Sequence, residues 1–316
     1  MNRRWFGAVL VALGAFLVVA AVVAQVWAPD VVKRTPLDVN QTTYLEGNAD
    51  KLDPTTGKLV SNPIYALDVT KSDSDASTGS VAVFVETTCV VVDEGQPREC
   101  VSGKDPRLVT AQIDTFATDR HTALAVNGDQ YVPADAVPHE GLVNKWPFDA
   151  QKKTYPYWEG TLGKAVPAEY VRTADVKGLE TYVYRVTTKG AKIDVVSDIP
   201  GTYDDLKEIY VDPRTGGIVQ QTENQQRYLE DGQKILDLQL GFTDQQQQDM
   251  VNEINDKYKL VDLALNKVPV VGYAVGIPVF LIGLALLFVR RRDEGRGGPA
   301  IEVEQPESPR PTQPVA

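Results

Sequence analysis

Two long apolar runs, one near each end of the chain, constrain what this sequence can fold into more than any other feature. Residues Trp5–Ala28 hold one polar side chain, Gln25, and residues Val268–Val289 hold no charged side chain. A helix over the second run spans about 33 Å, which matches the roughly 30 Å hydrocarbon core of a bilayer. Because a helix satisfies its own backbone hydrogen bonds in lipid, we predict two transmembrane helices.

A cleaved signal peptide is the alternative interpretation of the first run. Its apolar stretch is longer than the about 7–15 residues found in such peptides. Trp27 before Ala28 and Pro29 after it also make a poor cleavage site. We therefore predict that the first run is an uncleaved membrane anchor.

Arginines at the outer ends of both runs predict the orientation. Arg3 and Arg4 precede the first run, and Arg290–Arg292 follow the second. Because positive residues remain on the cytoplasmic side, we expect a two-pass protein of the cell membrane with both termini in the cytoplasm. The predicted parts are a cytoplasmic N-terminus (1–4), spans at 5–28 and 268–289, an extracytoplasmic domain (29–267) and a disordered cytoplasmic tail (290–316).

The predicted outer domain is strongly acidic. Residues 29–267 contain 25 Lys and Arg against 38 Asp and Glu, a formal charge of -13. Nucleic-acid binding depends largely on Lys and Arg meeting phosphate, so we expect no nucleic-acid partner. With both ends of one domain tethered, we expect that domain to lie close to the bilayer surface.

Cys89 and Cys100 are the only cysteines, and both fall in the outer domain. An oxidising compartment favours a disulfide between them, and the turn residues Gly95 and Pro97 suit a bridge across the base of a hairpin. Two buried free thiols are the alternative. Neither histidine stands at ligand spacing from the cysteines, so we expect no metal site and no cofactor.

Strand signals dominate the outer domain. Segments 80–92, 108–118, 122–126 and 179–187 are rich in β-branched and aromatic residues, and Asn127-Gly128 and Asp231-Gly232 predict hairpin turns. Thr243 is placed to cap a late helix that we expect to end before Asn266-Lys267; it either packs on the sheet or forms a stalk. The predicted fold class is α+β, a mainly antiparallel β domain with a C-terminal helix, flanked by two transmembrane helices.

An aromatic-rich stretch lies just before the middle of the chain. Its rings have two interpretations, core packing or the wall of a groove for lipid or sugar, because aromatic groups provide large apolar contact areas. The candidate residues are Trp146, Phe148, Tyr155, Tyr157 and Trp158.

Five segments follow one another in this part of the chain: WPFD (146–149), KTYPYW (153–158), PAEY (167–170), GLETYVY (178–184) and YVDPRTG (210–216). Taken in this order, they resemble a family of actinobacterial membrane proteins of unknown function labelled the porin PorA family. The resemblance implies a cell-envelope protein, and some relatives are tied to maturation of lipoglycans such as lipomannan. It supplies no catalytic residues.

The sequence contains no GxSxG, Walker A, HExxH or CxxC motif, so we predict no catalytic residues and no enzyme. The leading hypothesis is a non-enzymatic envelope protein whose outer domain binds a lipid, lipoglycan or envelope partner during envelope assembly or maintenance. The alternatives are a polysaccharide hydrolase that uses paired carboxylates and a subunit of an oligomeric porin-like channel.

Overall fold

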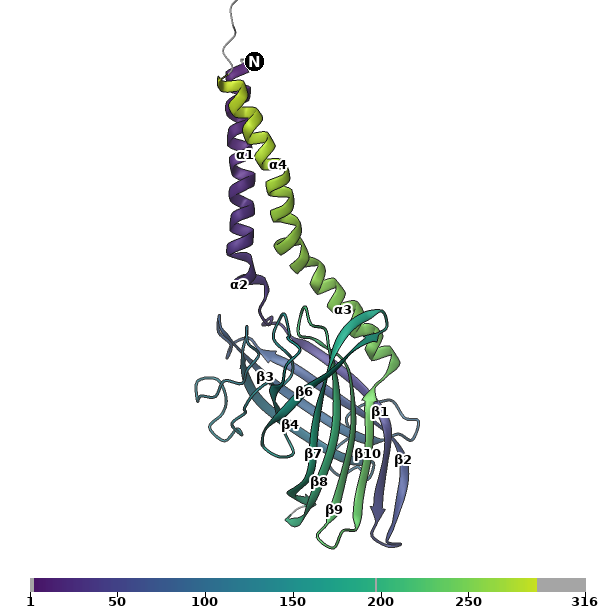
Figure 1. The fold of residues 1–316 in the computed structure, drawn as a ribbon. Coiled ribbons are helices and arrows are strands. Elements are labelled where there is room, and N and C mark those ends of the chain that lie inside the picture. Colours follow the sequence, from purple (N-terminus) through teal and green to yellow (C-terminus); the bar gives the residue numbers. More distant parts are fainter. Residues whose placement is uncertain (1–2, 197, 289–316) are drawn as a thin grey trace, which may run out of the picture. The chain divides into compact units, whose positions relative to one another are not determined.

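The computed structural model describes residues 3–196 and 198–288, so the predicted tail at 290–316 lies outside the described residues. The chain divides into two compact units, one of residues 1–19 and 271–316 and one of residues 20–270. Figure 1 labels the elements, and each unit is described by itself.

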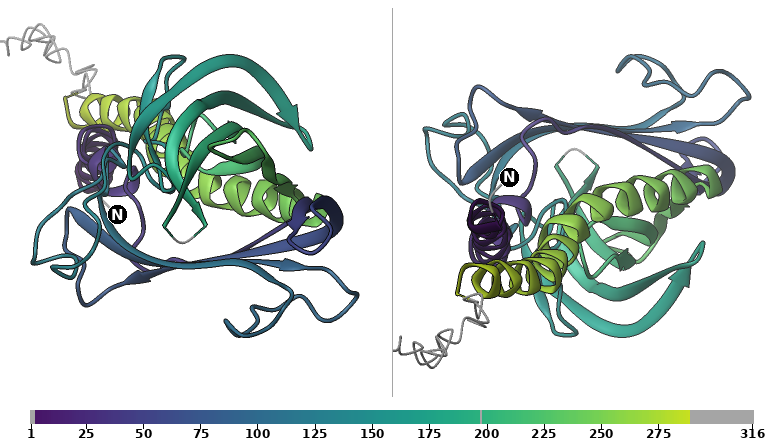
Figure 2. Two further views of the ribbon diagram at one scale, coloured as in Figure 1. Left: turned by 90° about the horizontal axis from the view of Figure 1, so that it is seen from below. Right: turned by 90° about the horizontal axis from the view of Figure 1, so that it is seen from above.

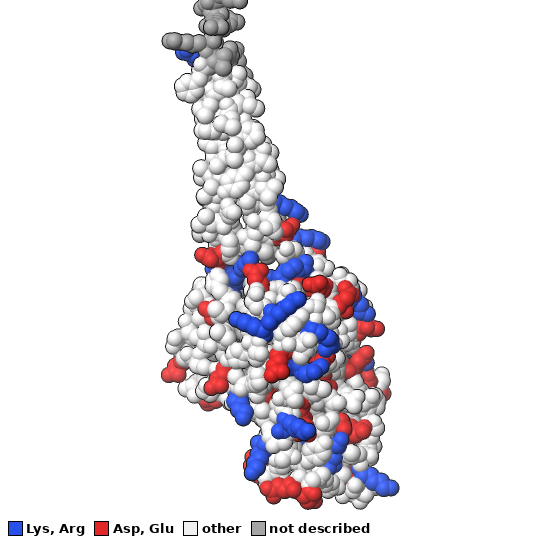
Figure 3. All heavy atoms as spheres, viewed as in Figure 1, with Lys and Arg blue, Asp and Glu red and all other residues white. Residues whose placement is uncertain are grey.

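The first unit pairs parts of two helices, α1 (Arg3–Val26) and α4 (Val268–Phe288). Glycines form the contact: a Cβ on Gly14 would lie 2.4 Å from the Phe280 backbone nitrogen, and one on Gly283 would lie 2.6 Å from that of Val11. Small residues let helices approach closely where lipid gives no hydrophobic drive for packing. Both helices are long and apolar enough to cross a membrane, and their surface in Figure 3 is almost free of charge.

The second unit is built on one antiparallel sheet of ten strands in the order β4-β3-β2-β1-β10-β9-β8-β7-β6-β5. The strands are β1 (Asn40–Asp53), β2 (Lys58–Asp73), β3 (Val81–Val92), β4 (Leu108–Asp119), β5 (Tyr155–Glu159), β6 (Lys164–Val176), β7 (Leu179–Val196), β8 (Ile199–Val211), β9 (Ile218–Leu229) and β10 (Lys234–Phe242). Figure 2 shows that the sheet curls, so that β1–β4 face β6–β9 across the interior. The predicted fold class is confirmed.

One of the two predicted hairpin turns, at Asp231-Gly232, joins neighbouring strands, and the other does not. Gly57 (φ 67°) lies in the β1–β2 turn and Gly232 (φ 87°) in the β9–β10 turn, where glycine adopts a positive φ without strain. The hairpin predicted at Asn127-Gly128 is wrong. Asn127 lies in a long loop, where its side chain bonds the backbone of His139, and residues 122–126 make only isolated bridges.

The late helix α3 (Asp244–Asp262) packs on the sheet. Met250, Val251 and Ile254 lie in one core cluster with Val219, and the Thr243 hydroxyl accepts a hydrogen bond from the Gln246 amide, as the capping prediction requires. α3 ends at Asp262, before Asn266 as predicted, but a π-helical turn (Leu263–Lys267) continues directly from it into α4. This wider turn lets the helix pass Pro269, whose missing N–H interrupts the ordinary ladder.

Cys89 and Cys100 form the predicted disulfide, with their Cα atoms 5.7 Å apart. Cys89 is buried on β3, and Cys100 lies in the loop that leads to β4. The bridge therefore ties this long loop to the sheet.

Candidate ligand-binding site

Four of the five candidate aromatic residues are buried and pack on other rings. Trp146 is fully buried and stacks on Tyr157 and Tyr184 with ring centroids 5.5 and 5.0 Å apart, and Tyr155 joins the same cluster. Trp158 lies in a second cluster, while Phe148 is only half-buried.

The loop that carries Trp146 and Phe148 is fixed to the β8–β9 turn. The Trp146 amide donates to the Gly216 carbonyl at 2.9 Å, and the Ala150 amide donates to that of Pro213 at 2.8 Å. A Cβ on Gly216 would lie 2.0 Å from the Trp146 carbonyl oxygen, so this position requires glycine. A Cβ on Gly217 would lie 2.9 Å from the side chain of Ile254 on α3. The loop, the β8–β9 turn and α3 therefore meet at one corner of the domain.

Lys145 lies in this corner loop without a counter-ion. Its side chain is half-buried, and its Nζ lies 4.5 Å from the ring centroid of Phe148. Among the described residues no carboxylate pairs with it and no hydrogen bond is formed. Burial, and secondarily the charge of Lys257 on α3, lower the pKa of Lys145 to about 7.

The corner also lies beside the point where the chain leaves α1. Asp149, four residues after Lys145, forms an ion pair with Lys33, directly after the short helix α2 (Ala28–Val32). All of these residues belong to the unit of residues 20–270. The loop is thus held next to Lys33, the residue that follows α2.

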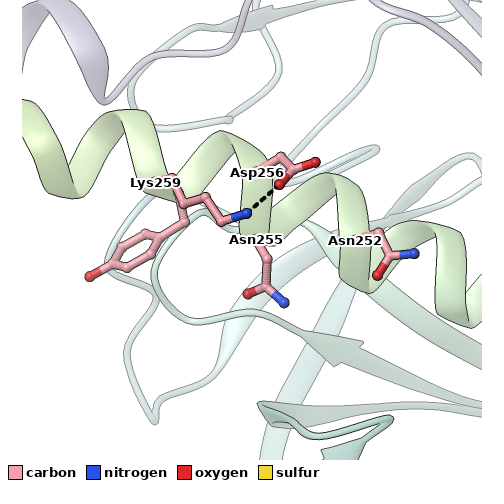
Figure 4. Close-up of a pocket in the computed structure, with 5 residues that line it drawn as sticks. Asn252, Asn255, Asp256 and Lys259 are labelled. Carbon is pink, nitrogen blue, oxygen red and sulfur yellow. Dashed lines mark hydrogen bonds and ion pairs between the residues drawn. The ribbon is translucent and has the colours of Figure 1, made fainter.

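Two surface grooves flank α3, and residues of polar, charged and aromatic types line both. The larger, about 580 Å³, is lined by Asn252, Asn255, Asp256, Tyr258 and Lys259, and Figure 4 shows the Lys259–Asp256 ion pair (2.7 Å) at its edge. Arg214 covers the Tyr258 ring at 4.1 Å. The smaller groove, about 410 Å³, lies at the start of α3 beside Tyr44 and Arg98. Neither groove is an apolar tunnel.

A charged network inside the curled sheet was missed by the sequence reasoning. Lys207 on β8 has its Nζ 3.5 Å from Glu223 and 3.6 Å from Glu159, with Asp205 at 4.0 Å. Burial lowers the pKa of Lys207, but the carboxylates of Glu223 and Glu159 outweigh it and raise that pKa well above its ordinary value. Burial has the opposite effect on an acid, and it raises the pKa of Asp205 to about 7.

The opposite wall of the interior carries more acids. Glu86 on β3 contacts Asp68 and lies near Asp114, and burial followed by these two neighbours raises the pKa of Glu86 well above its ordinary value. No cluster of three or more His, Cys, Asp or Glu in residues 3–196 and 198–288 is arranged to hold a metal ion. The interior therefore holds an excess of acidic groups over bases.

Comparison with known proteins places the chain in a family. The family model described as "Porin PorA" matches residues 6–285, which is most of the chain. A search of curated proteins found no match. Together with the two apolar helices, the family match indicates a membrane protein.

Proposed function

The chain belongs to the Porin PorA family, and we propose that it is a non-enzymatic cell-envelope protein whose outer domain binds the anionic headgroup of an envelope lipid or lipoglycan at Lys145. The observation that carries this proposal is the missing counter-ion. Other lysines of the domain without a carboxylate partner, such as Lys51, Lys58 and Lys104, are exposed to solvent, whereas Lys145 is half-buried and has none among the described residues.

A phosphate or carboxylate group would supply the charge that Lys145 lacks. Lys257, which itself pairs with Glu253, adds a second positive charge close by, and the Phe148 ring offers an apolar surface beside the ammonium group. An anion that neutralises a partly buried ammonium group makes a strong, charge-assisted hydrogen bond.

The position of the corner favours a headgroup over a free anion. The loop is tied to Lys33 near the end of α1, and in the proposed two-pass arrangement this end of the domain faces the bilayer surface. A headgroup there stays attached to its lipid in the membrane. The grooves along α3, lined by polar, charged and aromatic residues, suit sugars of such a headgroup better than acyl chains.

The interior acids argue against the hydrolase alternative. Glu159 and Asp205 are each only 2 % exposed, and they face Lys207 inside the sheet rather than lining either groove. A polysaccharide does not reach such a pair, so binding accounts for the domain better than hydrolysis.

The family's name favours a second candidate, a subunit of an oligomeric channel. Two helices alone do not enclose a water-filled pore, so this function requires several copies. Planar-bilayer recordings of the purified protein test it, and an absence of conductance at all protein concentrations counts against it.

Native mass spectrometry of the full chain in a non-ionic detergent tests headgroup binding. Added phosphatidylinositol should remain bound to the wild-type protein, and Lys145→Gln should lose most of this adduct. The matched control is Lys104→Gln, because Lys104 is exposed in a loop elsewhere in the domain. Equal retention by both variants and the wild type contradicts the proposal.

A further inference from the structure

Two arginines of the domain lie close together without a carboxylate partner. Arg34 comes two residues after α2, and Arg120 directly follows β4. Neither forms an ion pair among the described residues, and their guanidinium groups bond only backbone carbonyls. Most other arginines of this acidic domain pair with Asp or Glu. They are Arg98, Arg107, Arg172, Arg185 and Arg214.

Backbone hydrogen bonds hold the two arginines near each other. Thr35, next to Arg34, donates its amide to the Arg120 carbonyl at 2.7 Å, and its own carbonyl accepts from Arg120 Nε at 2.6 Å. The Arg120 amide also donates to the Ser80 carbonyl, and its Nη1 donates to that of Gly79 at 3.1 Å. Burial, followed by the charge of Arg34, lowers the pKa of Arg120, so the two like charges oppose each other.

The terminal nitrogens of both guanidinium groups have unused hydrogens. Arg34 bonds through Nε alone, to the Asp30 carbonyl at 3.0 Å, which leaves both of its Nη atoms without an acceptor among the described residues. Nη2 of Arg120 has none either. Since both side chains are only half-buried, a ligand can reach them. Guanidinium donors in this fork geometry match the oxygens of a phosphate or a carboxylate.

A buried hydroxyl beside the pair also lacks a partner. Thr35 is only 3 % exposed, and its Oγ1 forms no hydrogen bond with any described residue. Such a group is costly to bury unless a water or a ligand completes its bonding. Arg34, Thr35 and Arg120 therefore all have unused donors at one place in the fold.

Nearby acids do not neutralise the pair. Oδ1 of Asp119 accepts from the amides of His121 and Thr122, and Asp30 contributes only its backbone carbonyl to Arg34. Both guanidinium charges are thus available, and a dianion matches them better than a monoanion. A phosphomonoester carries about −1.5 to −2 charges at pH 7, whereas a phosphodiester carries a single negative charge.

The position of the pair favours a phosphomonoester that is attached to a lipid. The exposed Trp27 separates α1 from α2, and tryptophans are enriched where membrane spans meet the headgroups. The five residues of α2 rise about 7.5 Å, which is similar to the headgroup layer of about 5–8 Å on each side of the hydrocarbon core. In the proposed two-pass arrangement, Arg34 therefore lies at the depth of lipid phosphates.

We propose that Arg34 and Arg120 form a second anion site, which binds the phosphomonoester group of a membrane lipid, the chemistry of phosphatidic acid. The site itself stands independently of headgroup binding at Lys145, whereas the lipid source rests on the proposed two-pass arrangement. A lipid held at this site fixes the α2 end of the domain against the bilayer.

Native mass spectrometry of the full chain in a non-ionic detergent tests the proposal. All variants carry Lys145→Gln, so that the site of the proposed function does not contribute. This chain should retain phosphatidic acid at least about fivefold more than phosphatidylglycerol, a phosphodiester. Addition of Arg34→Gln should remove most of that preference. No preference for phosphatidic acid, or a preference that Arg34→Gln leaves intact, overturns the proposal.

Lys51→Gln is the matched control for the loss of one positive charge. Lys51 is exposed and lies at the far end of β1 from α2, so this variant should keep the preference for phosphatidic acid. Equal losses in Lys51→Gln and Arg34→Gln would show that net charge sets retention, and would contradict a site at the two arginines.

Inorganic phosphate distinguishes the two sources of the anion. In the Lys145→Gln chain, an excess of inorganic phosphate should compete with phosphatidic acid for Arg34. If this chain binds inorganic phosphate through Arg34 but retains no phosphatidic acid, the ligand is a free anion and the lipid assignment is wrong.

A conservative variant separates loss of binding from loss of folding. Arg34→Gln keeps the hydrogen bonds of Arg120, so its Tm should stay within about 2 °C of that of the Lys145→Gln chain. Arg34→Lys keeps the charge but loses the planar fork, so it should show about half of the preference or less. A full preference in Arg34→Lys contradicts a site built from two guanidinium groups.

Discussion

Lys207 and Lys145 are two desolvated lysines in one domain, and their surroundings are opposite. Lys207 has three carboxylates within 4.0 Å, and its pKa is raised well above the ordinary value despite burial. Lys145 has an aromatic ring and a second lysine as neighbours, and burial, followed by that lysine, lowers its pKa to about 7. Lys207 is therefore part of the scaffold, while Lys145 lacks a counter-ion among the described residues.

The difference shows how burial alone fails to define a lysine's role. A buried charge is stable when partners compensate its desolvation, and an uncompensated one lowers stability. Such a residue at a surface corner is typical of a binding site, where an external ligand completes the interaction. Replacing each lysine in turn tests whether the two residues have these different roles.

Removal of the Lys207 charge should have the largest effect. Lys207→Met leaves Glu159, Glu223 and Asp205 without their common cation, which should lower the free energy of unfolding of the outer domain by about 3–5 kcal/mol. Thermal unfolding at pH 7 measures this change. Lys104→Met, at an exposed position, should change it by less than about 0.5 kcal/mol. A similarly small change in the free energy of unfolding of both variants would contradict a scaffold role for Lys207.

Replacement of Asp205 by asparagine should have a smaller effect that depends on pH. Burial raises the folded-state pKa of Asp205 from 3.8 to about 7, so its contribution to stability is fully present below pH 3.8 and is lost as pH rises through 7. Relative to the wild type, Asp205→Asn should therefore gain about 2 kcal/mol between pH 5 and pH 8. Parallel pH–stability curves for the two proteins would show that Asp205 does not titrate in this range.

Replacement of Lys145 should have the smallest effect on stability, and with the opposite sign to Lys207. Since the folded-state pKa lies near 7 and the ordinary value is 10.5, the folded protein binds fewer protons between these values and its stability rises with pH there. By linkage this shift corresponds to about 5 kcal/mol at most, and contact of the half-buried side chain with water reduces it. Lys145→Met should therefore raise the free energy of unfolding by about 1 kcal/mol or more at pH 6, and the gain should fade towards pH 10. Destabilisation at pH 6 would instead indicate a structural role.

Sequence patterns predicted the parts of this protein that follow simple hydrophobic rules. The two apolar runs, the capping Thr243 and the Asp231-Gly232 turn all lie where local chemistry alone fixes the structure. The disulfide followed from there being two cysteines in one segment. In each case, the residues needed are close in sequence or unique in type.

The interior network could not be predicted in the same way, because it reverses the usual pattern. Strand β8 places Asp205 and Lys207 on its inward face, so alternation of apolar and polar residues does not reveal which face is buried. The i, i+2 spacing of these two charges was the available signal. Glu223 lies directly opposite Lys207 in the ladder of the neighbouring strands β8 and β9. Glu159 comes from β5, three strands from β8 in the sheet, and only the curl of the sheet brings it to Lys207.

Lys145 was equally hidden. It lies beside the predicted aromatic stretch, yet nothing in the sequence shows that the corner loop, the turn at Gly216 and α3 enclose it without an acid. The Asn127-Gly128 prediction failed for a related reason, because the Asn127 side chain bonds the distant His139 backbone rather than a local hairpin.

The pH titration of the Lys145 Nζ, followed by NMR in nitrogen-labelled full-length protein, is the sharpest test of a headgroup site at this residue. In lipid-free detergent the pKa of Lys145 should lie near 7, and addition of glycerol phosphate, a soluble headgroup analogue, should raise it by about one unit or more. An ordinary pKa near 10.5 without the anion, or a value near 7 that the anion leaves unchanged, would contradict a headgroup site at Lys145.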